Sequence, residues 1–242
     1  MCWWFDKIAV KQTLKLRDKF NISTYIETGT FRGINIKFHS YNFSEVLGCE
    51  INNGYYRTAK GRVRNLKNVT IYRQTSPEFL ADFRKKYRKA KRRDIVLIYL
   101  DAHFYNPLAT SKDRWVILKE LKVLKGFKNC IICIHDFDCA GLGHLCYNGQ
   151  SLDYSLIKKD ILDVNPDFFF YTNSRRFREV HSKQTIRRVI GLASDEDTLE
   201  TIKYHNCDSL KYRGILYCIP ERLDLKEFKL VKLRGGKNGK RS

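Results

Sequence analysis

Five polar side chains of types that do chemistry stand where short apolar runs of the sequence end. They are Glu27, Glu50, Asp101, His135 and Asp136. Carboxylates hold metal ions or accept hydrogen bonds from hydroxyl groups, and a histidine serves as a metal ligand or as a general base. A further histidine, His103, follows Asp101 by two residues. The set predicts one polar site, provided that the fold brings the ends of these runs together.

Apolar runs and helix-like segments alternate along most of the chain. The expected strands are 24–27, 46–50, 69–73, 95–100, 130–134, 168–172 and 214–219. The expected helices are 4–20, one from residue 33, 53–66, 76–93, 111–124 and 154–164. Continuous apolar strands separated by helices are typical of a parallel sheet that helices cover on both faces. Ligands bind at the carboxyl ends of such strands, so the polar residues are expected along one rim.

Local signals support two of these elements. The order of a strand, a glycine-containing turn and a helix at residues 25–33 brings backbone N–H groups close to a bound ligand, although the spacing is not that of dinucleotide-binding proteins. Glu50 follows Gly29 by about 21 residues, where an acid can accept hydrogen bonds from a ribose diol. Further along, Ser76 is expected as the N-cap of a helix that Pro77 and Glu78 continue.

Five short motifs, in this order, resemble those of the Rossmann-like S-adenosylmethionine (SAM)-dependent methyltransferases. They are Glu27-Thr-Gly-Thr-Phe-Arg-Gly33, Leu47-Gly-Cys-Glu50, Thr75-Ser76, Tyr99-Leu-Asp-Ala-His103 and Ile134-His-Asp-Phe137. The likeness is to a branch with E-T-G-T-F-x-G and L-D-A-H motifs, and it covers roughly residues 24–173. It implies an α/β fold with a doubly wound, mostly parallel, seven-stranded Rossmann-like methyltransferase sheet, preceded by an N-terminal helix and followed by a basic C-terminal tail.

The resemblance also implies SAM as the cofactor. The cofactor-binding residues that it implies are Glu27, Thr28, Gly29, Thr30, Gly33, Glu50, Ser76 and Asp101. By this resemblance Glu27, Gly29 and Gly33 would line the methionine and ribose end of SAM. Glu50 would hold the ribose hydroxyls and Ser76 would lie by the adenine, while the two threonines would add backbone or hydroxyl contacts.

A divalent metal is the second cofactor that the resemblance implies. In metal-dependent O-methyltransferases of the catechol and macrolide-sugar types, one acid ends strand four and an acidic pair ends strand five. The metal ligands would be Asp101, His135 and Asp136, with His135 where an Asp is common. Such an ion, Mg or Mn, chelates the acceptor diol and lowers its pKa, and imidazole beside carboxylates suits Mn or Fe better than Mg. Without a metal, His103 or His135 is the expected general base, so Asp101, His103 and His135 are the catalytic candidates.

The ribose 2′-O-methyltransferases also resemble this fold, but they rely on a Lys-Asp-Lys-Glu tetrad. Asp101 fills the Asp position, whereas His135-Asp136 stands where the second Lys would be expected. This departure argues against the tetrad mechanism but not against an RNA substrate.

Positive charge dominates the composition. Lys and Arg total 46 against 26 Asp and Glu, a formal net charge of +20, which indicates a polyanionic partner. Basic clusters lie at 84–93, 175–188 and in the tail 226–242. The nucleic-acid-binding candidates are Arg84, Lys85, Lys86, Arg88, Lys89, Lys91, Arg92 and Arg93. Phosphate contacts position a nucleic acid without reading its sequence, and an acidic protein or an anionic membrane would use the same charges.

Length and composition bound the remaining expectations. The 242 residues predict an N-terminal helical extension (1–22), one methyltransferase-like domain (23–225) and a basic tail (226–242), with no structure assigned to 175–212. No apolar run is long enough for a spanning helix, and the first residues lack the apolar core of a signal peptide. Eight cysteines, most of them inside apolar runs, suit a reducing compartment, so an intracellular protein (cytoplasmic, organellar or associated with a viral particle) that is not secreted is expected.

Together these observations predict a SAM-dependent methyltransferase, directed to oxygen, that acts on or is bound to nucleic acid, with RNA favoured. Two alternatives stay open. The first is a catalytically inactive methyltransferase fold that serves as an RNA-binding or structural subunit of a large particle, such as a ribosome or virion. The second is a small-molecule, metal-dependent O-methyltransferase, which fits the motifs but leaves the charge of +20 unexplained.

Overall fold

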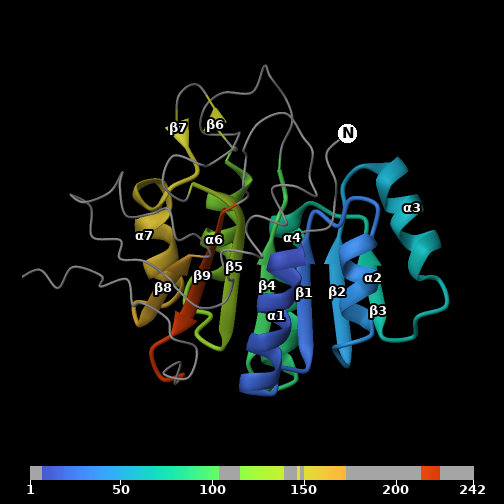
Figure 1. Cartoon of the computed structure of the whole chain (residues 1–242), viewed down its shortest axis with the longest axis horizontal. Coiled ribbons are helices and arrows are strands. Elements are labelled where there is room, and N and C mark those ends of the chain that lie inside the picture. Colours follow the sequence, from blue (N-terminus) through green and yellow to red (C-terminus); the bar gives the residue numbers. More distant parts are fainter. Residues whose placement is uncertain (1–6, 104–114, 139–145, 148–149, 173–213, 224–242) are drawn as a thin grey trace, which may run out of the picture.

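The structure is a computed structural model that describes residues 7–103, 115–138, 146–147, 150–172 and 214–223. Its centre is a seven-stranded sheet in the order β3-β2-β1-β4-β5-β9-β8 (Figure 1). The strands are β1 (Thr24–Thr28), β2 (Glu45–Cys49), β3 (Val69–Tyr72), β4 (Val96–Leu100), β5 (Cys130–Phe137), β8 (Phe168–Thr172) and β9 (Gly214–Pro220). The first five are parallel and β9 is antiparallel to both of its neighbours, which confirms the predicted doubly wound, mostly parallel α/β sheet.

Helices cover both faces of this sheet. They are α1 (Lys7–Phe20), α2 (Ile34–Ser40), α3 (Asn53–Val63), α4 (Ser76–Lys89), α6 (Val116–Leu124) and α7 (Tyr154–Val164). The first three pack in one hydrophobic cluster with the sheet, and the last three pack in another on the opposite face. Figure 1 shows α1 and α2 in front of the sheet and α4 behind it. A separate two-stranded ladder joins β6 (Cys146–Tyr147) and β7 (Gln150–Ser151).

The two cysteines of β5 show that side chains of one strand pack on both faces of the sheet. Cys130 packs in the cluster of α4, α6 and α7, whereas Cys133 packs in the cluster of α1, α2 and α3. Residues three apart on a strand face opposite sides, so these two sulfurs do not converge on one ion. Burial raises the pKa of both thiols, which keeps them protonated and unreactive at neutral pH.

The start of α4 differs from its expected form by one residue. The N-cap is Thr75, whose hydroxyl accepts the backbone N–H of Glu78 while the Glu78 carboxylate accepts the N–H of Thr75. Ser76 is therefore the first helical residue, and the prediction that it caps the helix is wrong. The reason is that the reciprocal bonds of a capping box need an acid three residues after the cap, and only Thr75 stands at that distance from Glu78.

The glycine turn after β1 has a packing reason of its own. Gly29 has φ +71°, and a Cβ built on it would lie 2.7 Å from the backbone oxygen of Asp101 at the end of β4. The turn therefore presses directly against the neighbouring strand end, and both the backbone angle and the space require glycine.

Substitution of this glycine is expected to be costly. Gly29→Ala should lower the free energy of unfolding by about 3 kcal/mol, because a left-handed alanine is strained and its methyl overlaps backbone atoms that cannot move aside. Gly61→Ala is the matched control, since Gly61 lies inside α3 with nothing within 4 Å of its added Cβ. The control should be stabilised by about 0.5–1 kcal/mol. Urea unfolding of both variants checks this, and equal stability of Gly29→Ala and wild type would contradict it.

In the part of the chain that the structure describes, no helix is both long and apolar enough to cross a membrane. The basic segments 175–188 and 226–242 lie outside the described residues.

Candidate active site

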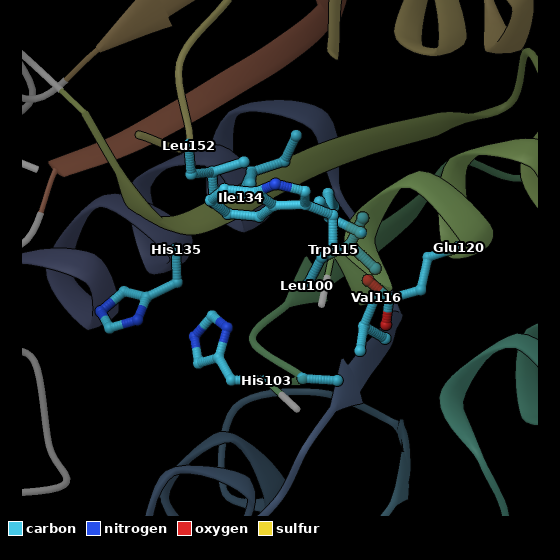
Figure 2. Close-up of a pocket in the computed structure, with 10 residues that line it drawn as sticks. Leu100, His103, Trp115, Val116, Glu120, Ile134, His135 and Leu152 are labelled. Carbon is cyan, nitrogen blue, oxygen red and sulfur yellow. The ribbon is translucent and has the colours of Figure 1, made fainter. Parts of the chain in front are cut away.

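Two histidines and two aspartates from the ends of β4 and β5 form one cluster. Its members, Asp101, His103, His135 and Asp136, have ligand atoms that all lie within 4.8 Å of one another. His103 Nε2 lies 3.1 Å from Asp101 Oδ1 and 2.9 Å from Asp136 Oδ2. His135 Nδ1 lies 2.9 Å from the same Asp101 oxygen and 3.3 Å from Asp136 Oδ1. Figure 2 shows the two imidazole rings facing each other beside a pocket. We call this group the His/Asp cluster.

A β-bulge makes the cluster possible. His135 and Asp136 are consecutive in β5, and neighbours on a regular strand point to opposite faces. The register between β5 and β9 shifts between Ile134 and Phe137, and Asp136 has φ 57°. The left-handed residue turns the strand so that His135 reaches Asp101 and Asp136 reaches His103, and both side chains are buried, at 3% and 4% exposure. Strained bulges of this kind are common beside active sites.

The charges within the cluster reinforce one another. Burial on its own would raise the pKa of Asp101, but the neighbouring His135 and His103 outweigh it and lower that pKa to about 2. For His103, removal from water acts to lower the pKa, but hydrogen bonds with Asp101 and Asp136 outweigh it and raise the pKa to about 9. In the absence of other cations, Asp101 is therefore ionised and the His103 imidazole is protonated at neutral pH.

Glu27 lies at the end of β1, the strand next to β4, and it has a separate hydrogen-bond network. The Tyr25 hydroxyl donates to Glu27 Oε2 at 2.8 Å, and Asn35 Nδ2 donates to the same oxygen at 2.6 Å. Burial raises the pKa of Glu27 to about 8 even though these two hydrogen bonds lower it, and the charge of Asp101 adds to the rise. The carboxyl group is thus held in place by two donors, and the charge of His135 offsets only a small part of the rise in its pKa.

Glu50, directly after β2, is fixed by backbone groups. Its carboxylate accepts the N–H of Phe31 and the N–H of Asn52, each at 2.8 Å. Burial raises its pKa, and these backbone hydrogen bonds offset part of the rise. Each oxygen keeps a second lone pair, so the oriented carboxylate can still accept hydroxyl groups of a ligand.

The sequence predicts that the glycine turn brings backbone N–H groups close to a ligand, and in the structure three of these amides donate to the protein itself. The amides of Gly29 and Thr30 both donate to Cys49 O, and the amide of Gly33 donates to Thr30 O. Gly33 has φ +73°, and an added Cβ would lie 2.9 Å from Ala59, so its role is close packing of α2 on α3. The bonds to Cys49 O tie the turn after β1 to the end of β2.

The predicted hydroxyl residues divide into two kinds. Thr28 Oγ1 accepts the backbone N–H of Asp101 at 3.2 Å, which joins the ends of β1 and β4. Thr30 Oγ1 is buried and makes no hydrogen bond with the described residues. Ser76 Oγ is also buried, and it lies close to the Glu120 carboxyl without a hydrogen bond of ordinary geometry. A buried hydroxyl without a partner is unfavourable, so Thr30 Oγ1 indicates a polar ligand or a water molecule at this edge.

Glu120 on α6 is a residue that the sequence analysis missed. It is 1% exposed and lines the pocket of Figure 2, on the side away from the two histidines. Neither carboxylate oxygen makes a hydrogen bond of ordinary geometry with the described residues. Burial raises its pKa to about 7, although the nearby hydroxyls of Ser76 and Thr28 act to lower it. The signal was present in the sequence, because Glu120 stands three residues after Ile117 and four before Leu124 on the apolar stripe of the helix.

The basic cluster 84–93 is not part of this edge. α4 starts beside the site at Ser76 and runs back to the amino end of β4, so its last turns lie at the opposite edge of the sheet. Two of the eight candidates have structural roles. Arg84 donates to the backbone oxygens of Val123 and Lys125, and Arg92 pairs with Glu45 and Asp94.

Comparison with known proteins gives limited information. No protein-family model and no curated protein matches this chain. Similar solved structures include the plantazolicin methyltransferase BamL, with 14% identity, 89% of this chain and 84% of that chain covered, and a TM-score of 0.49. An rRNA methylase from Streptococcus thermophilus has 7% identity, coverages of 90% and 98%, and a TM-score of 0.47. The N-methyltransferase NodS from Bradyrhizobium japonicum has 11% identity, coverages of 89% and 95%, and a TM-score of 0.46.

Proposed function

We propose that this protein is a SAM-dependent methyltransferase that transfers a methyl group to an oxygen atom of an acceptor held at the His/Asp cluster. One observation carries the proposal. Glu27 stands at the end of β1 and Glu50 directly after β2, while the His/Asp cluster stands at the ends of β4 and β5. Four adjacent strands therefore present two chemically different half-sites along one edge. One half suits a cofactor with hydroxyl and ammonium groups, and the other suits the acceptor.

The cofactor half fits SAM by its donor and acceptor chemistry. Glu27 and Glu50 are acceptors with oriented carboxyl groups, and SAM carries an ammonium group and a ribose diol as donors. The buried hydroxyl of Thr30, which has no partner among the described residues, fits the same ligand. When bound, SAM supplies an electrophilic methyl group on a sulfonium sulfur. The chain supplies position and a site from which water is excluded.

The acceptor half fits a divalent metal. Four nitrogen and oxygen ligands within 4.8 Å of one another match the ligand set of Mn²⁺ or Fe²⁺ better than the all-oxygen set of Mg²⁺. His103, expected from the sequence only as a base, joins Asp101, His135 and Asp136 in that set. A bound ion would supply a Lewis acid that lowers the pKa of the acceptor hydroxyl. The residues themselves would hold the ion and so orient the acceptor beside the cofactor half, and without an ion an imidazole of the cluster would receive the acceptor proton.

Nucleic acid, with RNA favoured, is the acceptor class that we propose, because a net charge of +20 favours a polyanionic substrate. A small catechol-like or sugar acceptor would use the same cluster without needing that charge.

Calorimetric titration of the purified protein with SAM and with its demethylated product tests the cofactor half. We expect micromolar affinity that Glu50→Ala weakens about 100-fold, because two charge-assisted hydrogen bonds to the ribose are lost. Glu45→Ala is the matched control, since Glu45 starts the same strand at the far edge and pairs with Arg92. Its affinity should equal that of wild type. Absence of heat and of thermal stabilisation by SAM would reject the proposed activity and favour the non-catalytic alternative.

A further inference from the structure

We infer that the outer face of α4 and the loop after it bind the phosphate backbone of a nucleic acid, at the edge of the sheet opposite the active site. We call this surface the α4 basic face. It consists of Lys85, Lys86, Arg88, Lys89, Lys91 and Arg93, all of which are exposed. The inference concerns binding, so it holds whether or not the bound strand is the methyl acceptor.

The face results from the way α4 divides its side chains. Phe79, Leu80, Phe83 and Tyr87 are buried against the sheet and α6. The acids of the helix, Glu78 and Asp82, lie in its first two turns, where Glu78 closes the capping box and Asp82 accepts a hydrogen bond from Gln74. The last two turns and the following loop therefore present cations with no acid among them until Asp94.

The cationic side chains of 84–93 differ in their contacts: two of them bind other parts of the protein, and the others are exposed. Arg84 and Arg92 are committed to the contacts with α6 and with Glu45 and Asp94, and Arg92 also donates to Thr24 Oγ1. Their side chains are only partly exposed. Lys86 Nζ lies 5.2 Å from the centre of the Tyr72 ring, which orients it beside β3. Lys85, Arg88 and Lys89 project from the helix as exposed cations, and Lys91 and Arg93 continue the charge past its end.

The α4 basic face is distant from the His/Asp cluster. α4 has 14 residues, so it is about 20 Å long, and its first residue lies at the active-site edge. The basic turns are at its other end, beside the amino end of β4. A nucleic acid held here is positioned by its backbone, while the His/Asp cluster remains open to whatever acceptor reaches it.

The character of the surface favours phosphate over the other anionic partners. Among the described residues, the exposed large hydrophobic side chains are Tyr41, Ile51 and Tyr55, and none lies on α4. A helix that binds a membrane surface inserts an apolar face, which α4 instead buries in the core. Protein interfaces are depleted in lysine and centred on aromatic residues, and the α4 basic face has the opposite composition. Closely spaced lysines and arginines without apolar neighbours are what backbone phosphates bind.

Fluorescence anisotropy of the full-length protein with a labelled single-stranded RNA of mixed sequence tests the inference. The variant Lys85→Gln, Arg88→Gln, Lys89→Gln should bind roughly tenfold more weakly, or worse, at moderate salt. The slope of log K against log salt should fall by about 2, because each lost phosphate contact removes about 0.7 for a single strand. The control variant Arg57→Gln, Lys60→Gln, Arg64→Gln removes the same charge from exposed positions at α3. It should keep the wild-type slope to within about 0.7.

Three results would overturn the inference. The first is an equal loss in the control variant, which would assign the binding to overall charge. The second is an absence of RNA binding by the wild-type protein. The third is binding to phosphatidylserine vesicles, in preference to RNA, that depends on the same three residues. Titration of the α4 variant with SAM keeps this test separate from the proposed activity, because an intact cofactor site at the other edge should give the wild-type result.

Discussion

Glu27→Gln is expected to remove SAM binding and, at the same time, to stabilise the ligand-free protein at pH 8. The folded protein raises the pKa of Glu27 from an ordinary 4.5 to about 8 because the carboxyl group is buried, with Asp101 adding to the rise and Tyr25, Asn35 and His135 opposing it. The folded state therefore binds this proton more tightly than the unfolded state. Stability from this group is complete below pH 4.5 and is lost as the pH rises from 4.5 to 8.

The amide of glutamine cannot ionise, so this loss disappears in the variant. Its oxygen can still accept the hydrogen bonds that Tyr25 and Asn35 donate to Glu27. At pH 8 the gain in the free energy of unfolding is at most about 5 kcal/mol, and it should vanish near pH 4.5. Binding of SAM should nevertheless weaken by at least about 100-fold, since the neutral amide no longer attracts an ammonium group.

Urea unfolding at pH 4.5 and pH 8, together with calorimetric titration of SAM, measures both effects. Tyr25→Phe serves as a comparison, because it removes one donor to Glu27 and keeps the carboxyl group. It should leave SAM binding detectable and should not raise stability at pH 8. A Glu27→Gln variant that is less stable than wild type at pH 8, or that binds SAM normally, would contradict the assignment of Glu27 to a cationic ligand group. Gain of stability with loss of binding is the pattern expected when a site is kept at a cost to the fold.

The parts of the fold that follow from local pattern could be predicted from the sequence. The apolar runs at 95–100 and 130–134 became central strands because a strand buried on both faces is apolar along most of its length. Since these strands are parallel and adjacent, the polar residues after them had to meet at one edge. That reasoning brought Asp101 and His135 together correctly without any knowledge of side-chain geometry.

What could not be predicted depends on contacts between distant segments. The left-handed conformation of Asp136 arises where β5 meets β9, a strand almost 80 residues further along the chain, so no local signal announces the bulge. The amides of the glycine turn are taken by Cys49 O because β2 lies beside β1, and the spacing of the glycines does not reveal that bond. In the same way, His103 was expected only as a base and not as a metal ligand. Its closeness to Asp136 depends on how the ends of β4 and β5 are aligned, which the sequence does not reveal.

Asp101→Asn is expected to have the largest effect on the acceptor half of the site. Asp101 Oδ1 contacts both His103 and His135, so it is the carboxylate that joins the two imidazoles. Replacement by an amide removes one negative charge from a set of four ligands and leaves a weaker oxygen donor in its place. We expect Mn²⁺ affinity to fall at least about 100-fold, and methyl transfer to an oxygen acceptor to fall by about 10³-fold.

Electron paramagnetic resonance of free Mn²⁺ reads the metal affinity directly and needs no acceptor. Asp160→Asn is the matched control, an identical change on α7. It should titrate Mn²⁺ like wild type. Equal Mn²⁺ affinity in Asp101→Asn and wild type would show that the ion binds elsewhere.

A wild-type protein that binds no divalent ion, yet transfers methyl groups in the presence of a chelator, would show that the cluster acts without a metal. In that case His135→Gln should abolish transfer while Asp101→Asn should only reduce it, because the imidazole then receives the acceptor proton and the carboxylate only orients the ring.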